Sequence, residues 1–184
     1  MKHSLVQLIR TIAVIVISVG ITSNSYADRK GRTDIKMDNA QLQTLIQKLD
    51  QHYKGEDGYW ELTLEGVSLK VITDERADRM RIIAPIVKTD DLNKDELYRL
   101  LQANFDSALD ARYAIAQGIV WGTFLHPLST LDSEDFILGM GQTVNIVSSY
   151  GAAYSSGLFV FRGGDSDKLQ VELMERLRKL SDSI

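Results

Sequence analysis

Two histidines are the first candidates for chemistry in the chain after residue 27. His52 and His126 stand far apart, and neither has a second ligand at a spacing typical of metal sites. The chain has no cysteine, which excludes disulfides, thiolate nucleophiles and sulfur metal ligands. The sequence therefore predicts no metal site.

Serines and acidic pairs give no clearer catalytic signal. Ser129 and Ser133 lack the G-x-S-x-G context of a nucleophile elbow, which leaves only a hydrolase site assembled from distant loops. Acidic pairs that can act as general acid and base, or bind Ca²⁺, occur at Glu56-Asp57, Asp90-Asp91 and Glu134-Asp135. Each pair falls in a turn or near a helix start, where carboxylates are common for structural reasons. We therefore predict a non-enzymatic protein with no catalytic residue and no cofactor.

Overall charge limits the classes of partner. The 184 residues carry a net charge of −4, and residues 1–27 contribute only the charges of Lys2 and Arg10. The remainder is therefore more acidic than the whole. Because nucleic acids and anionic membranes select clustered Lys and Arg, we expect no nucleic-acid partner.

The first 27 residues resemble a secretory signal peptide. A basic start (Lys2, His3, Arg10) precedes the apolar run Thr11–Ile21, and Ser25-Tyr26-Ala27 places small residues at −3 and −1 of a cleavage site. The alternative, an uncleaved anchor, needs about 20 apolar residues. We predict cleavage after Ala27, a periplasmic or secreted protein with no stable membrane anchor, and a flexible lead over 28–37.

Hydrophobic periodicity predicts an α+β domain in the order α-β-β-β-α-β-β-α over residues 38–153. A helix is expected over 39–52, and another from 133 to about 150. Glu65-Gly66 and Gln117-Gly118 are each expected to form a two-residue hairpin turn. Pro85 removes a ladder donor and predicts an edge strand or a bulge. Residues 154–184 form a C-terminal extension that ends in an amphipathic helix.

The helix between the two sets of strands has the strongest local signals. Asn93-x-x-Glu96 is a capping-box pattern. Its apolar residues follow at i, i+3, i+4 and i+8 and are expected to form one helix face, made of Leu97, Leu100, Leu101 and Phe105.

Small residues mark the helix from 133. Gly139 and Gly141 each cost about 1 kcal/mol relative to Ala in a helix interior, but they let another backbone approach closely. Two interpretations stay open: packing on the protein's own sheet, or contact with a helix of a partner subunit. Whether the C-terminal helix folds back or engages a partner also stays open.

The core resembles the YbjN-like and type III secretion chaperone-like (CesT-type) domains. The resemblance lies in the segments 95–105 (DELYRLLQANF), 111–115 (ARYAI), 126–129 (HPLS) and 131–136 (LDSEDF). It implies an antiparallel sheet of about five strands with helices packed on it, often in a homodimer. It also implies binding of protein segments or a regulatory role, without catalysis. The export signal and the C-terminal helix depart from secretion chaperones and favour an exported YbjN-like protein.

Aromatic residues are the predicted protein-binding positions. Trp121 and Phe124 fall on opposite faces of one strand because their spacing is odd. One face is expected to lie under helices while the other contacts a protein partner or homodimer mate. Phe159 and Phe161, in the apolar stretch after residue 155, complete the set of predicted binding residues. The alternative function is a small-ligand or lipid carrier with a pocket between sheet and helices.

Overall fold

The computed structural model describes residues 36–106, 108–150 and 168–182, which belong to one compact unit. The helices are α1 (Asn39–Leu49), α2 (Lys94–Asp106), α3 (Ser133–Ser148) and α4 (Lys168–Asp182). The strands are β1 (Lys54–Glu56), β2 (Tyr59–Leu64), β3 (Val67–Asp74), β4 (Arg79–Lys88), β5 (Arg112–Ala116) and β6 (Ile119–His126). Two 3₁₀ turns complete the order, η1 (Thr89–Asp91) before α2 and η2 (Leu128–Thr130) before α3.

The six strands form one antiparallel sheet in the order β1-β2-β3-β4-β6-β5. The predicted α+β class and element order are confirmed, with six strands in place of about five. The additional strand is β1, because residues 54–56, expected to be part of a turn, pair with β2. Pro85 lies at a bulge in β4, and β4 lies between β3 and β6 rather than at an edge.

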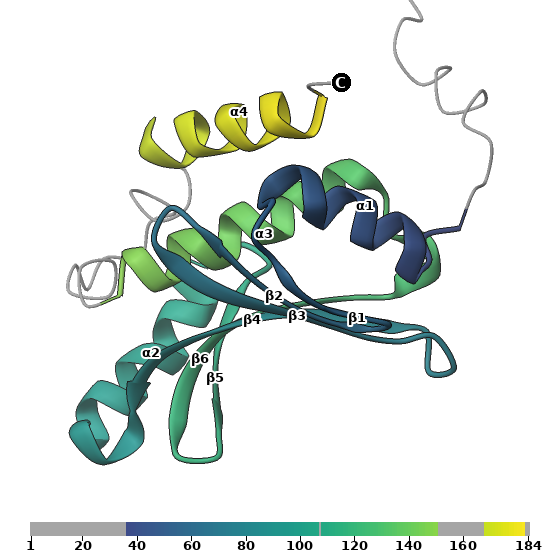
Figure 1. Cartoon of the computed structure of the whole chain (residues 1–184). Helices are drawn as coiled ribbons and strands as arrows, with labels where there is room; N and C mark the ends of the chain where they lie inside the picture. Colours follow the sequence, from purple (N-terminus) through teal and green to yellow (C-terminus); the bar gives the residue numbers. More distant parts are fainter. Residues whose placement is uncertain (1–35, 107, 151–167, 183–184) are drawn as a thin grey trace, which may run out of the picture. The chain divides into compact units, whose positions relative to one another are not determined.

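One face of the sheet is covered by helices. α1 and α3 lie over it, and α4 packs on these two helices on the side away from the sheet (Figure 1). The core between sheet and helices includes Trp60, Leu69, Val71, Ile82, Val120, Phe136 and Met140. The opposite face of the sheet, here called the open face, carries no described helix (Figure 1).

Local chemistry sets the helix starts and the hairpins as predicted. Asn93 Oδ1 accepts from the backbone N–H of Glu96 at 3.0 Å, while Glu96 Oε2 accepts from the Asn93 N–H at 2.8 Å. This reciprocal pair is a capping box. In the turn of Gln117 and Gly118 both residues have positive φ (53° and 71°), as a type I′ hairpin requires.

The small residues of α3 are used within the chain. A Cβ on Gly139 would lie 2.6 Å from ring carbons of Phe124 on β6, so the helix packs directly on the sheet. A Cβ on Gly141 would meet the Met174 sulfur of α4. Both glycines therefore permit close packing inside the chain, and the helix that approaches α3 is the chain's own α4.

Candidate protein-binding surfaces

The clearest unpartnered apolar surface is a stripe on α2. Tyr98, Leu101 and Phe105 are 63%, 66% and 83% exposed. At about 100° per residue, their spacing of i, i+3 and i+7 places them within about 60° of the helix circumference. We call these three residues the α2 stripe.

The apolar face predicted for this helix is covered only in part. Of Leu97, Leu100, Leu101 and Phe105, only Leu100 is buried and Leu97 is half-buried. The reason is that α2 lies at the end of the sheet beside β5, where Leu100 and Ala103 alone are turned fully inward. Tyr98, which no sequence pattern singled out, belongs to the exposed side.

A paired hydrogen bond fixes α2 to the edge of the sheet. Asn104 Nδ2 donates to the Tyr113 carbonyl oxygen at 3.0 Å, and the Tyr113 N–H donates to Asn104 Oδ1 at 2.7 Å. The Tyr113 hydroxyl donates to the Ile146 carbonyl oxygen of α3 at 3.1 Å. Asn104 is about 60° or more from every residue of the α2 stripe, so these bonds turn the stripe away from β5.

Trp121 and Phe124 occupy the two faces of β6 in the alternation that the odd spacing predicted. Phe124 is 5% exposed and packs on Gly139, so it belongs to the core and is not available as a binding residue. Trp121 lies on the open face, where its indole Nε1 donates to the Ala116 carbonyl oxygen at 3.0 Å. Leu125, on the same face, is 57% exposed. Phe159 and Phe161 lie outside the described residues.

A charged cluster occupies the β2–β3 half of the open face. Lys70 Nζ lies 2.6 Å from Glu61 Oε1 and 2.7 Å from the Tyr59 hydroxyl oxygen. Hydrogen bonds to Lys70 and Tyr59 lower the pKa of Glu61, and the bond to Glu61 raises the pKa of Lys70. Lys70 and Glu61 therefore neutralise each other within this cluster.

Ser129 and His126 do not form a catalytic relay with Asp78. Ser129 donates from its backbone N–H and its hydroxyl to the two oxygens of Asp78, at 2.7 and 2.8 Å. His126 Nδ1 lies 2.8 Å from the Pro127 carbonyl oxygen. In a serine hydrolase the imidazole lies between the serine hydroxyl and the carboxylate. Here the Ser129 hydroxyl bonds the Asp78 carboxylate directly. The bonds from Ser129 lower the pKa of Asp78 and join the β3–β4 turn to η2.

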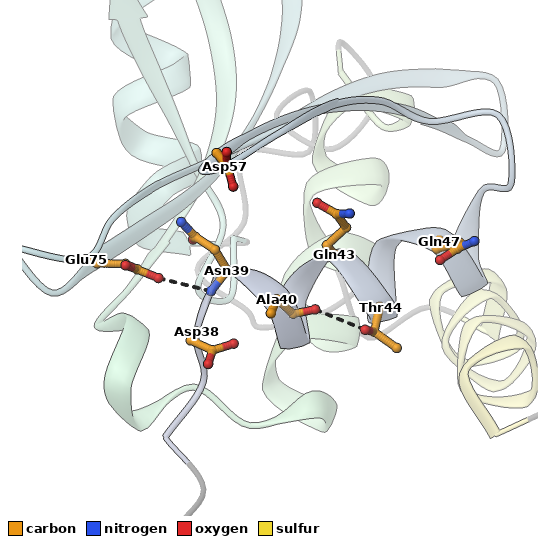
Figure 2. A pocket seen from close by; sticks show the side chains of 8 residues that line it. All are labelled: Asp38, Asn39, Ala40, Gln43, Thr44, Gln47, Asp57 and Glu75. Carbon is orange, nitrogen blue, oxygen red and sulfur yellow. Dashed lines mark hydrogen bonds between the residues drawn. The ribbon is translucent and has the colours of Figure 1, made fainter.

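A polar hollow of about 490 Å³ lies beside the start of α1 (Figure 2). Its lining residues are Asp38, Asn39, Ala40, Gln43, Thr44, Gln47, Asp57 and Glu75. Asp38 Oδ1 accepts from the Gln41 N–H at 2.9 Å, and Glu75 Oε1 from the Asn39 N–H at 3.2 Å. Both carboxylates thus cap the helix. A polar lining of this kind does not favour a lipid ligand.

Two searches of the described residues bear on other site classes. Within 36–106, 108–150 and 168–182, no group of three His, Cys, Asp or Glu side chains is arranged to hold a metal ion. No helix in those ranges is both long and apolar enough to span a bilayer.

Comparison with known proteins gives structural likenesses alone. No protein-family model matches the sequence, and no curated protein matches it. The chain is similar to a chain of the HopA1–SchA chaperone–effector complex, with 14% identity and a TM-score of 0.46 over 61% of this chain and 94% of that one. It is also similar to a chain of the ExsC–ExsE complex, with 16% identity and a TM-score of 0.45 over 59% of this chain and 90% of that one.

Proposed function

We propose that this chain is a non-enzymatic, exported protein of the YbjN-like type that binds a protein partner in a chaperone-like or regulatory role. The observation that carries the proposal is the α2 stripe. A partner that covered these three large apolar side chains would gain roughly 25 cal/mol of binding free energy for each Å² of apolar surface removed from water. Contiguous apolar patches of this kind mark interaction sites on soluble proteins.

The helix that carries the stripe is held in place before any partner arrives. The capping box of Asn93 and Glu96 fixes its start, and Asn104 fixes its second half to Tyr113. A preformed surface loses less conformational entropy on binding, so more of the apolar burial appears as affinity. The i, i+3, i+7 spacing is that of a helix laid against another apolar helix or groove. A second copy of this chain is the first partner to test.

Two charge insertions test the stripe. Residues 28–184 with Leu101→Glu or Phe105→Glu are compared with the unchanged protein by light scattering coupled to size exclusion and by native mass spectrometry. The matched control is Arg99→Gln, which changes the net charge equally at an exposed α2 position off the stripe. We expect the unchanged protein and the control to associate, and each stripe variant to associate at least tenfold more weakly, about 1.4 kcal/mol.

The identity of the associated species shows whether the partner is a second copy of this chain or a different protein. A dimer lost only in the stripe variants means that the partner is a second copy, and a co-purified protein lost in the same way means a different partner. Equal association of all four proteins would contradict the role of the stripe. An unchanged protein that stays alone at every concentration tested, and carries a small molecule, would instead support the carrier alternative.

Export is tested separately. The proposal is supported by the basic start, the apolar run and the small residues before Asp28. Expression of residues 1–184 in a bacterium with a periplasm, followed by fractionation and intact-mass measurement, is expected to give a periplasmic protein that begins at Asp28. Full-length protein retained in the cytoplasm or membrane would contradict it.

A further inference from the structure

The two halves of the open face differ in charge. In the β2–β3 half, Lys70 is paired with Glu61 and Tyr59. In the half formed by β4, β6 and β5, the strand register shows which side chains point to the open face, and none of them is acidic. These residues are Arg79, Arg81, Ile83, Pro85 and Lys88 on β4; Ile119, Trp121, Thr123 and Leu125 on β6; and Arg112, Ala114 and Ala116 on β5.

Two arginines of this half, Arg81 and Arg112, have no acidic partner among the described residues. Arg112 donates to the carbonyl oxygen of the preceding Ala111 at 3.1 Å, and no described carboxylate pairs with Arg112 or Arg81. Arg79 lies opposite Asp74 in the register, so we leave it out of the patch. A protein with a net charge of −4 thus carries an uncompensated basic patch on a face that no described helix covers.

The register arranges the basic and apolar side chains in a regular pattern. Along β6, the outward column is Trp121, Thr123 and Leu125. Arg112 stands opposite Thr123 on one side of the column, and Arg81 stands opposite Leu125 on the other. With strands about 4.8 Å apart and same-face residues about 7 Å apart along a strand, the arginines flank an apolar column within reach of one segment.

We propose that this patch, Arg81, Arg112, Trp121 and Leu125, binds an extended protein segment in which Asp or Glu alternates with apolar residues. The apolar side chains of such a segment would cover Trp121 and Leu125, and its carboxylates would meet the two arginines, which bind carboxylates in a bidentate manner. In an extended segment every second side chain points to the same side, which matches the spacing of the outward side chains along β6. The acidic remainder of the chain disfavours bilayers and nucleic acids, which present much larger negative surfaces.

This inference rests on the proposed protein-binding function but uses a different surface from the α2 stripe. Stripe variants that dissociate a partner while the patch binds nothing would defeat this inference alone. A patch that binds its segment while the stripe variants behave like the unchanged protein would defeat only the role of the stripe.

Selection from a random peptide-display library tests the proposal. Residues 28–184 serve as bait, and the Arg81→Glu/Arg112→Glu double variant serves for counter-selection. We expect retained peptides to be rich in Asp and Glu at alternate positions. A labelled peptide of that set should bind at least tenfold more weakly to the double variant and to Trp121→Ala, as measured by fluorescence anisotropy, and more weakly at high salt.

Two controls make the result specific. Arg76→Glu reverses an exposed charge outside the patch and should bind as the unchanged protein does. Arg81→Lys/Arg112→Lys keeps the charge but loses the bidentate geometry, so its affinity should fall between those of the unchanged protein and the Arg81→Glu/Arg112→Glu variant. Circular dichroism shows whether each variant is folded. Peptides without acidic enrichment, peptides retained equally by the double variant, or tighter binding to phosphatidylglycerol vesicles or to an oligonucleotide would each overturn the proposal.

Discussion

The side-chain amide of Asn104 on α2 bonds both backbone polar groups of Tyr113 on β5, as an adjacent strand would. Because β5 is an edge strand, its outward N–H and C=O groups are open to pairing with another chain. Asn104 therefore closes the edge at this residue and at the same time fixes the orientation of α2 and its stripe.

Replacing Asn104 tests this dual role. Asn104→Ala should lower the free energy of unfolding by about 1–3 kcal/mol, because it leaves two backbone groups without their partner. Urea unfolding measures the loss, and light scattering measures the increased aggregation expected of an opened edge. Asn104→Asp keeps the acceptor for the Tyr113 N–H but sets a charged oxygen, in place of the donor, against the Tyr113 carbonyl oxygen, so it should also be less stable than the unchanged protein. An Asn104→Asp variant as stable as the unchanged protein would mean that the bond to the Tyr113 carbonyl contributes nothing.

Close packing of α3 on β6 predicts an unusual cost for a small change. Gly139→Ala should destabilise the protein by about 1–3 kcal/mol, although Ala is the better helix former, because the added Cβ would lie 2.6 Å from the Phe124 ring. Thermal or urea unfolding measures the loss. In a Phe124→Leu background the same substitution should cost less. A loss that is identical in both backgrounds would show that the ring is not the obstacle.

The docking of α4 predicts a contrast between two leucines of one helix. Leu177 is 1% exposed and Leu180 is 45% exposed. Leu177→Ala should cost about 2–5 kcal/mol if α4 unfolds with the domain, since it removes buried apolar surface and leaves a cavity. Leu180→Ala, the control, should cost much less. If both variants unfold like the unchanged protein while amide exchange in 168–182 becomes faster, α4 detaches before the domain unfolds.

The bond between Asp78 and Ser129 predicts a dependence of stability on pH. Hydrogen bonds from Ser129 lower the folded-state pKa of Asp78, so the ionised carboxylate stabilises the fold above the unfolded-state pKa of about 4. This contribution disappears as the pH falls through the lowered folded-state pKa. Asp78→Asn, which tolerates the positive φ of 51°, should therefore destabilise the protein at pH 7 and converge with it at lower pH. Urea midpoints measured between pH 7 and pH 2 check this, and a constant difference over the range would contradict it.

The sequence by itself determined the features that depend on near neighbours. The capping box of Asn93 and Glu96, the Gln117-Gly118 turn and the alternation of Trp121 and Phe124 follow from backbone sterics and side-chain reach over a few residues. The same local rules predicted the α+β class and the order of the elements.

The tertiary structure alone decided which apolar surfaces are covered. Leu100 and Leu101 are adjacent and equally apolar, yet one is buried and the other exposed, because α2 packs at the sheet end and not across its face. Likewise, Gly141 meets α4 because a helix more than 25 residues later in the chain returns to it. Periodicity states that a face is apolar, but the element that covers it comes from distant segments, and burial depends on where those segments pack.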